Sequence, residues 1–188
     1  VERDDLVLSL AYFWLQSDSE LIFAGDSGGT EASDGSKRSG LELAVFWELN
    51  SKWVVDVSGS FTDSKFVGVD SRFNHIPNAH GRVISMGLTH APVLGWNWSM
   101  RDRHFGDAAL VEDDSINYPG TTIVNMGVSY KTDRWTAGVD LFNLADSEHY
   151  DIAYWYSSRL SSEVSPVEDI HFHPVNPRSI RVCLEYRF

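Results

Sequence analysis

Hydrophobic and polar residues alternate along most of the chain. In the last ten residues, Ile180, Val182, Leu184, Tyr186 and Phe188 fall on one face, with mostly polar residues between them. This period of two predicts a β-strand with one apolar face, whereas helical periodicity is almost absent. Similar stretches predict nine strands, at residues 6–14, 20–25, 40–48, 53–61, 82–90, 96–105, 121–131, 135–142 and 179–188.

The connections between these strands alternate in length. Short turns fall at residues 16–19, 49–52, 92–95 and 131–134, and long loops at 25–39, 65–81, 106–120 and 145–178. Because successive antiparallel strands run in opposite directions, this alternation places the short turns at one end of a meander. The long loops then gather at the other end.

Large aromatic residues lie beside the short turns. They are Trp47, Trp53, Trp96, Tyr130, Trp135, Tyr186 and Phe188. Aromatic side chains at one level of an apolar face are typical of a membrane interface. The sequence therefore predicts an all-β fold, an antiparallel transmembrane β-barrel segment of about nine strands. The alternative is a soluble ligand-binding β-barrel or sandwich whose apolar face is the core.

Composition and charge narrow the classes of partner. The net charge of -12 over 188 residues argues against nucleic acid, whose phosphates need cations. The sequence contains no run of about 18 apolar residues, and so it predicts no transmembrane helix. The single cysteine, Cys183, excludes a disulfide within the chain. We find no catalytic spacing or cofactor motif, and so predict neither an enzyme nor a cofactor.

The predicted number of strands indicates part of a larger barrel. Lipid leaves no place for an open sheet edge, and single-chain bacterial barrels close with an even number of strands. Either the weakest predicted strand, 20–25, is misassigned, or the chain is one portion of a wider barrel. Charges on the polar faces, among them Arg101, Arg103 and Arg181, suit a wide lumen better than a narrow one.

Several motifs occur in the order found in one known family. Residues 37–66 carry R-x-G-x-E-L followed by W-x-x-x-x-S-x-S-x-T-D-S, residues 125–130 carry N-x-G-x-x-Y, and residues 140–146 carry D-x-F-N-L-x-D. With the terminal strand ending in Phe188, this series resembles the late barrel strands of TonB-dependent outer-membrane receptors.

The resemblance implies a 22-stranded barrel with an N-terminal plug domain, importing a scarce ligand such as a ferric siderophore or other metal chelate. Residues 1–188 would then be the C-terminal portion of the barrel, because no plug or TonB box has a counterpart in them. The expected location is the bacterial outer membrane, with the long loops extracellular and the C-terminus periplasmic. The implied partners are outer-membrane lipid, the TonB complex through the plug, a small-molecule ligand, and the assembly machinery that reads Tyr186 and Phe188. The alternative is a complete small outer-membrane barrel with an adhesion or structural role.

The last long loop and the polar strand faces supply the candidate ligand contacts. The aromatic and cationic loop candidates are Tyr150, Tyr154, Trp155, Tyr156 and Arg159, which could stack on a ligand ring or simply fold the loop. His171 and His173, with Glu168 and Asp169 nearby, could hold a transition metal or pack against a neighbouring loop. Arg101, Arg103 and Arg181 could guide an anionic ligand, although pairing with carboxylates is the simpler expectation.

Overall fold

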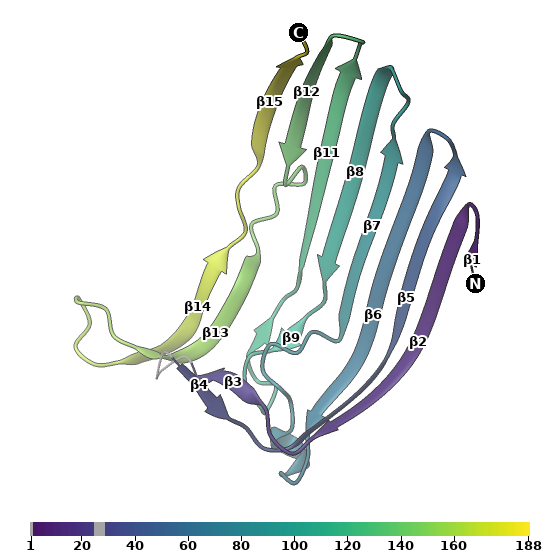
Figure 1. The fold of residues 1–188 in the computed structure, drawn as a ribbon. Helices are drawn as coiled ribbons and strands as arrows, with labels where there is room; N and C mark the ends of the chain where they lie inside the picture. The colour runs from purple at the N-terminus through teal and green to yellow at the C-terminus, as the bar shows by residue number, and fades with distance from the viewer. Residues whose placement is uncertain (1, 25–28) are drawn as a thin grey trace.

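The computed structural model describes residues 2–24 and 29–188, and its main feature is a curved antiparallel sheet of nine strands (Figure 1). In sheet order the strands are β1 (Glu2–Arg3), β2 (Leu6–Ser17), β5 (Ser36–Asn50), β6 (Trp53–Phe66), β7 (Arg82–His90), β8 (Gly95–Phe105), β11 (Thr121–Lys131), β12 (Trp135–Phe142) and β15 (Ser179–Tyr186). Each strand pairs with the next long one along the chain, which confirms the predicted meander. The described residues contain no helix with the length and apolar character needed to cross a membrane.

One predicted strand of the wall is wrong. Residues 20–25 form only the short strand β3 (Leu21–Ala24), which pairs with β4 (Gly29–Ala32) in a separate hairpin, and Gly25 lies outside the described residues. Four residues extend about 13 Å, too short to cross a hydrocarbon layer of about 30 Å. The sheet still has nine strands because the two-residue β1 pairs with the start of β2.

The strand register places apolar residues opposite apolar residues across the sheet, so that one face of the sheet is apolar. Leu8, Val45, Val57 and Met86 lie opposite one another on β2, β5, β6 and β7, in a continuous apolar row. These side chains have little of the chain to pack against, and Leu10 on the same face is 71% exposed. A one-residue slip would move every apolar side chain to the polar face, so the apolar pattern fixes this register.

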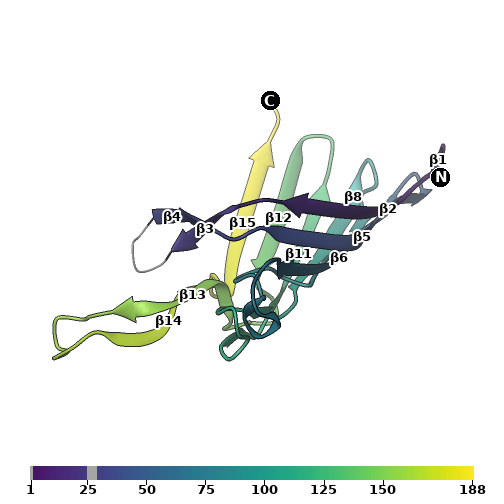
Figure 2. The same cartoon turned by 90° about the horizontal axis from the view of Figure 1, so that it is seen from below.

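The long connections fold at one end of the sheet, and the short turns predicted at 49–52, 92–95 and 131–134 lie at the other (Figure 1). The short turn predicted at 16–19 is wrong, because β2 extends to Ser17 and the residues after it belong to the long connection between β2 and β5. The loop after β8 contains β9 (Ala108–Ala109) and β10 (Asn117–Tyr118), and the loop after β6 contains the short helix η1 (Ser71–Phe73). The loop after β12 is a β-hairpin, β13 (Tyr150–Ser158) with β14 (Val167–Pro174), which extends away from the sheet (Figure 2). Residues 145–178, which were predicted to be a loop, therefore contain a regular β-hairpin.

The buried hydrophobic cluster lies beneath these loops. Ala108, Leu110, Tyr118 and Ala153 form it, so the β9–β10 loop packs against the β13–β14 hairpin. The Tyr118 hydroxyl donates to the backbone oxygen of Tyr150 at 2.6 Å, and burial raises the pKa of Tyr118. We call this packed group of loops the loop cap, and it positions the site described next.

Candidate functional site

Two hollows open at the loop end of the polar face. The first, which we call the outer cavity, has a volume of about 650 Å³ and is lined by all four long connections. Its lining includes Glu20, Glu112, Tyr154, Trp155, Tyr156 and Glu168. The predicted aromatic run at 154–156 is thus placed in one cavity, together with carboxylates contributed by three different loops. A volume of this size suits a small organic ligand.

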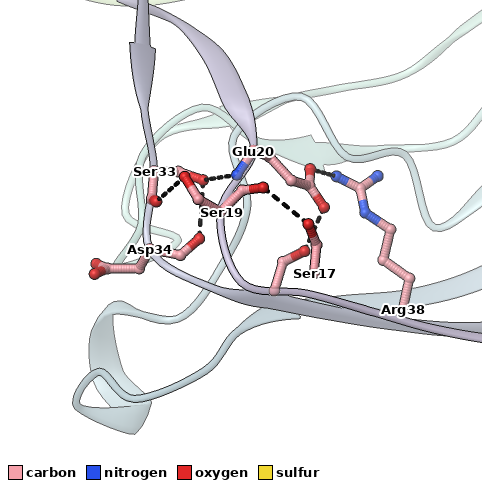
Figure 3. A network of polar contacts seen from close by, with 7 residues as sticks. Ser17, Ser19, Glu20, Ser33, Asp34 and Arg38 are labelled. Carbon is pink, nitrogen blue, oxygen red and sulfur yellow. Dashed lines mark hydrogen bonds and ion pairs between the residues drawn. The ribbon is translucent and has the colours of Figure 1, made fainter.

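A polar network holds the β3–β4 hairpin at the edge of the outer cavity (Figure 3). The Glu20 carboxylate accepts a hydrogen bond from the hydroxyl of Ser36, which is 1% exposed, and another from the Arg38 guanidinium. The Ser33 amide donates to the backbone oxygen of Glu20 at 2.8 Å. The Ser36 hydroxyl, followed by Arg38, lowers the pKa of Glu20 despite the opposing effect of burial.

We expect Glu20→Gln to loosen this hairpin at neutral pH. A carboxyl with a lowered pKa stabilises the folded state above its ordinary value of 4.5, and this stabilisation is lost as the pH falls below that value. Losing charged hydrogen bonds should cost about 1–2 kcal/mol, or a 5- to 30-fold faster exchange of the Ser33 amide. Hydrogen exchange read by mass spectrometry checks this, and the ratio of variant to parent should approach one at about pH 3.

Asp34→Asn is the matched control for that experiment. Asp34 follows Ser33 in the same loop, but its carboxylate points away from Glu20 in Figure 3. An equal effect of Asp34→Asn would mean that loop charge in general, and not the Glu20 contacts, holds the hairpin.

The second hollow, which we call the inner groove, has a volume of about 600 Å³ and lies at the base of the β13–β14 hairpin. Its lining joins Arg101 and Arg103 of β8 to Asp151 and His173 of the hairpin. Asn143, which is 3% exposed, ties this base together. Its backbone amide donates to Asn125 Oδ1 at 2.9 Å, and its side-chain amide donates to the backbone oxygens of Ser147 and Asn176.

The predicted lumen arginines differ in their partners. Arg101 forms two hydrogen bonds with Asp56, at 2.9 and 3.0 Å, and Arg181 forms two with Asp140, at 2.9 and 3.0 Å. The Asp56–Arg101 pair crosses the position of Gly87, where a Cβ would lie 2.3 Å from the Asp56 carboxylate. In the described part of the chain, the guanidinium of Arg103 has no ion pair or hydrogen bond.

The remaining hairpin candidates have structural contacts. Tyr150 stacks on Phe172 with ring centres 4.1 Å apart and packs on the buried cluster. Arg159 donates to the backbone oxygen of Glu163 near the hairpin tip. Neither residue lines the outer cavity or the inner groove.

The two histidines lie in different settings. His171 stacks on Tyr156 with ring centres 3.7 Å apart, and its ring nitrogens lie 2.6 Å from Ser158 Oγ and 3.0 Å from the Asp169 backbone oxygen. His173 lies 3.8 Å from Asp151 in the inner groove. Among residues 2–24 and 29–188, no three His, Cys, Asp or Glu side chains are grouped to hold a metal ion. The metal site suggested by the spacing of the histidines stays a prediction.

The apolar face has a larger hollow, of about 800 Å³, but it is an unsuitable ligand site. Valine, alanine, leucine and aromatic side chains form most of its lining, including Val128, Val139 and Val182. Trp96, Tyr130 and Trp135 border it in a row of aromatic contacts, with ring centres 5.1 and 5.8 Å apart. Few polar groups are available there to orient a ligand, whereas this lining suits contact with lipid chains.

An antiparallel meander with one apolar face, an aromatic row and long loops over a charged face defines a segment of an outer-membrane β-barrel. The sequence pattern of the family described as "TonB dependent receptor-like, beta-barrel" matches residues 2–144. The chain belongs to the TonB-dependent receptor family, and the resemblance predicted from the motifs is confirmed.

Solved structures with the same fold include three receptors. The ferric yersiniabactin uptake receptor FyuA from Yersinia pestis has a TM-score of 0.73 at 16% identity, and the match covers 100% of this chain and 28% of that one. The ferric-catecholate import receptor Fiu from E. coli K12 has a TM-score of 0.70 at 16% identity over 98% and 25% of the two chains. The siderophore receptor PiuA from Acinetobacter baumannii has a TM-score of 0.71 at 16% identity over 97% and 26%. The chain therefore spans 25–28% of the length of these receptors.

Sequence reasoning missed several residues of both hollows. Glu20, Glu112, Asp151 and Asn176 line them although no motif marks these positions, and Asn143 was part of the D-x-F-N-L-x-D motif without being assigned to a site. The acidic composition of the long loops was visible in the sequence. Which carboxylates share a cavity depends on how the loops pack together, and that packing has no periodic signal.

Proposed function

We propose that the chain is the C-terminal barrel portion of a receptor that imports a ferric siderophore or another metal chelate using energy transmitted by TonB. The observation that carries the proposal is the outer cavity, where four long loops place Tyr154, Trp155 and Tyr156 on the polar side of the wall. Aromatic rings in a cavity of about 650 Å³ can hold the organic part of a chelate by stacking. Such a receptor transports its ligand and catalyses no reaction.

The proposal includes an orientation and further strands. The long loops face the outside, the short turns and the C-terminus face the periplasm, and the plug domain contacts the TonB complex. In a closed 22-stranded barrel, the free edges of β2 and β15 pair with strands outside these residues, because lipid cannot satisfy open backbone groups. Tyr186 and Phe188, whose rings are 5.2 Å apart, form the signal for outer-membrane assembly.

Uptake of radioactive iron by cells producing the complete receptor tests this function. The probes are ferric complexes of one catecholate, one hydroxamate and one citrate ligand, each supplied to a host without its own siderophores. We expect one class to enter in a TonB-dependent manner. Tyr156→Ala should reduce its uptake about tenfold by removing a stacking surface worth about 1–1.5 kcal/mol. Tyr156→Phe should retain most of the uptake.

Val164→Ser is the matched control, since Val164 lies on the same hairpin, is 98% exposed and lines neither hollow. Receptor levels in the outer membrane are measured for every variant. Uptake that is the same without the receptor, or that persists without TonB, would contradict the proposed function.

A further inference from the structure

The inner groove contains a guanidinium, that of Arg103, for which residues 2–24 and 29–188 supply no counter-ion. Arg103 points to the same polar face as Arg101, two residues away on β8. The strand register explains why only one of them is neutralised. Across the sheet, the row of Arg101 contains Gly87 on β7 and Asp56 on β6. The row of Arg103 contains Ser58, Ser85 and Ile123, and hence no carboxylate.

Neither neighbouring acid replaces the missing partner. Asp102 follows the opposite parity on β8, and successive side chains of a strand point to opposite faces. Asp151 lines the groove, but its carboxylate lies beside His173, at 3.8 Å from Nδ1. No described carboxylate thus neutralises Arg103, and the other walls of its groove include Ile123, Phe142 and Val175.

From this arrangement we infer that the inner groove binds an oxyanion of the ligand, with Arg103 as the binding residue and Arg101 as a wall residue held by Asp56. A guanidinium offers two parallel N–H groups that match a carboxylate, and such charge-assisted pairs are stronger than neutral hydrogen bonds. The apolar side chains beside it suit the carbon skeleton of an organic acid. His173 lines the hairpin end of the same groove, beside the carboxylate of Asp151. The inference rests on the proposed function, because it specifies the chemistry of the ligand that enters.

Arginine labelling distinguishes the two arginines without any transport. The complete receptor in detergent micelles is treated with phenylglyoxal, and labelled peptides are quantified by mass spectrometry. We expect Arg103 to react about fivefold or more faster than ion-paired Arg101, since a guanidinium bound to a carboxylate is less available. Citrate is the anionic probe and glycerol the neutral one, at constant ionic strength. Citrate should slow the labelling of Arg103 about threefold or more, because a bound carboxylate covers the guanidinium. The labelling rate of Arg159 should stay unchanged.

A designed counter-ion provides the second test. Ser85→Asp places a carboxylate opposite Arg103, in the same relation as Asp140 to Arg181. It should slow the labelling of Arg103 and remove the effect of citrate. Ser129→Asp makes the same change of charge on the polar face of β11, opposite Asn97 and Gly138, and should leave citrate protection intact.

The outcomes separate the two proposals. Equal labelling of Arg103 and Arg101, absence of citrate protection, or equal effects of the two aspartate variants would each overturn the anion site. Protection of Arg103 in a receptor that imports no chelate would support the anion site while overturning the uptake function.

Discussion

Val45→Arg should lower the free energy of unfolding of the receptor barrel in lipid by about 2 kcal/mol, because it places a charge on the membrane-facing surface between the interface and the midplane, where an arginine costs about 2–4 kcal/mol. Val45 lies in the apolar row between Leu8 and Val57, inward of Trp47 at the short-turn end of β5. Few polar neighbours are available on that face to compensate a guanidinium. The measurement is urea unfolding of the complete receptor in lipid vesicles, followed by tryptophan fluorescence.

Ala44→Arg is the control one residue away. Ala44 lies on the polar face in a groove of about 300 Å³ that also contains Ser9, Glu42 and Ser58. An arginine there has space, water and a nearby carboxylate, so we expect a change below about 1 kcal/mol. Equal losses at positions 44 and 45 would contradict the assignment of one face to lipid and the other to the lumen.

Gly40→Ala should destabilise the barrel by about 3 kcal/mol or more, the upper end of the range for overpacking. A Cβ at this position would lie 2.4 Å from the backbone oxygen of Phe61 and 2.8 Å from the ring of Phe13. The backbone of β6 cannot move away without breaking its ladder with β5. The same urea titration measures the loss, and the fraction of receptor that resists heat on a gel gives an independent reading.

Gly59→Ala is the matched control, since Gly59 lies within β6 and its added Cβ would meet only the Phe61 ring at 3.5 Å. That distance is an ordinary contact, and alanine is the better residue within a strand by about 0.5–1 kcal/mol. We therefore expect Gly59→Ala to be neutral or slightly stabilising. A loss equal to that of Gly40→Ala would mean that glycine at both positions serves backbone flexibility and not close packing.

The sequence predicted the wall better than the loops, for a physical reason. A strand with one apolar and one polar face has a period of two, and this signal survives in eight long segments of the wall. The short apolar run at 20–25 lacks that length, so it could not be distinguished from a loop hairpin. The two-residue β1 pairs with β2 but has no periodic signal at all.

For the site, alternation predicted the face of each arginine but not its partner. Arg101 and Arg103 have the same parity and similar surroundings in the sequence. Their difference arises from residues some twenty to fifty positions away, Asp56 in one row and Ser85 in the other. Likewise, the aromatic run at 154–156 was recognised as a candidate site. Glu20, Glu112 and Glu168 share its cavity, but they come from three long connections whose packing against one another has no periodic signal in the sequence.

The loop cap has a buried cluster of its own, formed by Ala108, Leu110, Tyr118 and Ala153, whereas the apolar face of the wall is left for lipid. The stability of the cap thus depends on burying apolar side chains from water, whereas the stability of the wall depends on the lipid around it. Changes in acyl chain length or detergent act mainly on the wall, whereas urea and temperature act on both parts and reach the cap through its own small core. Within the described residues, this buried cluster joins loop to loop and includes no residue of the wall strands, so a change in the packing of the cap need not alter the wall.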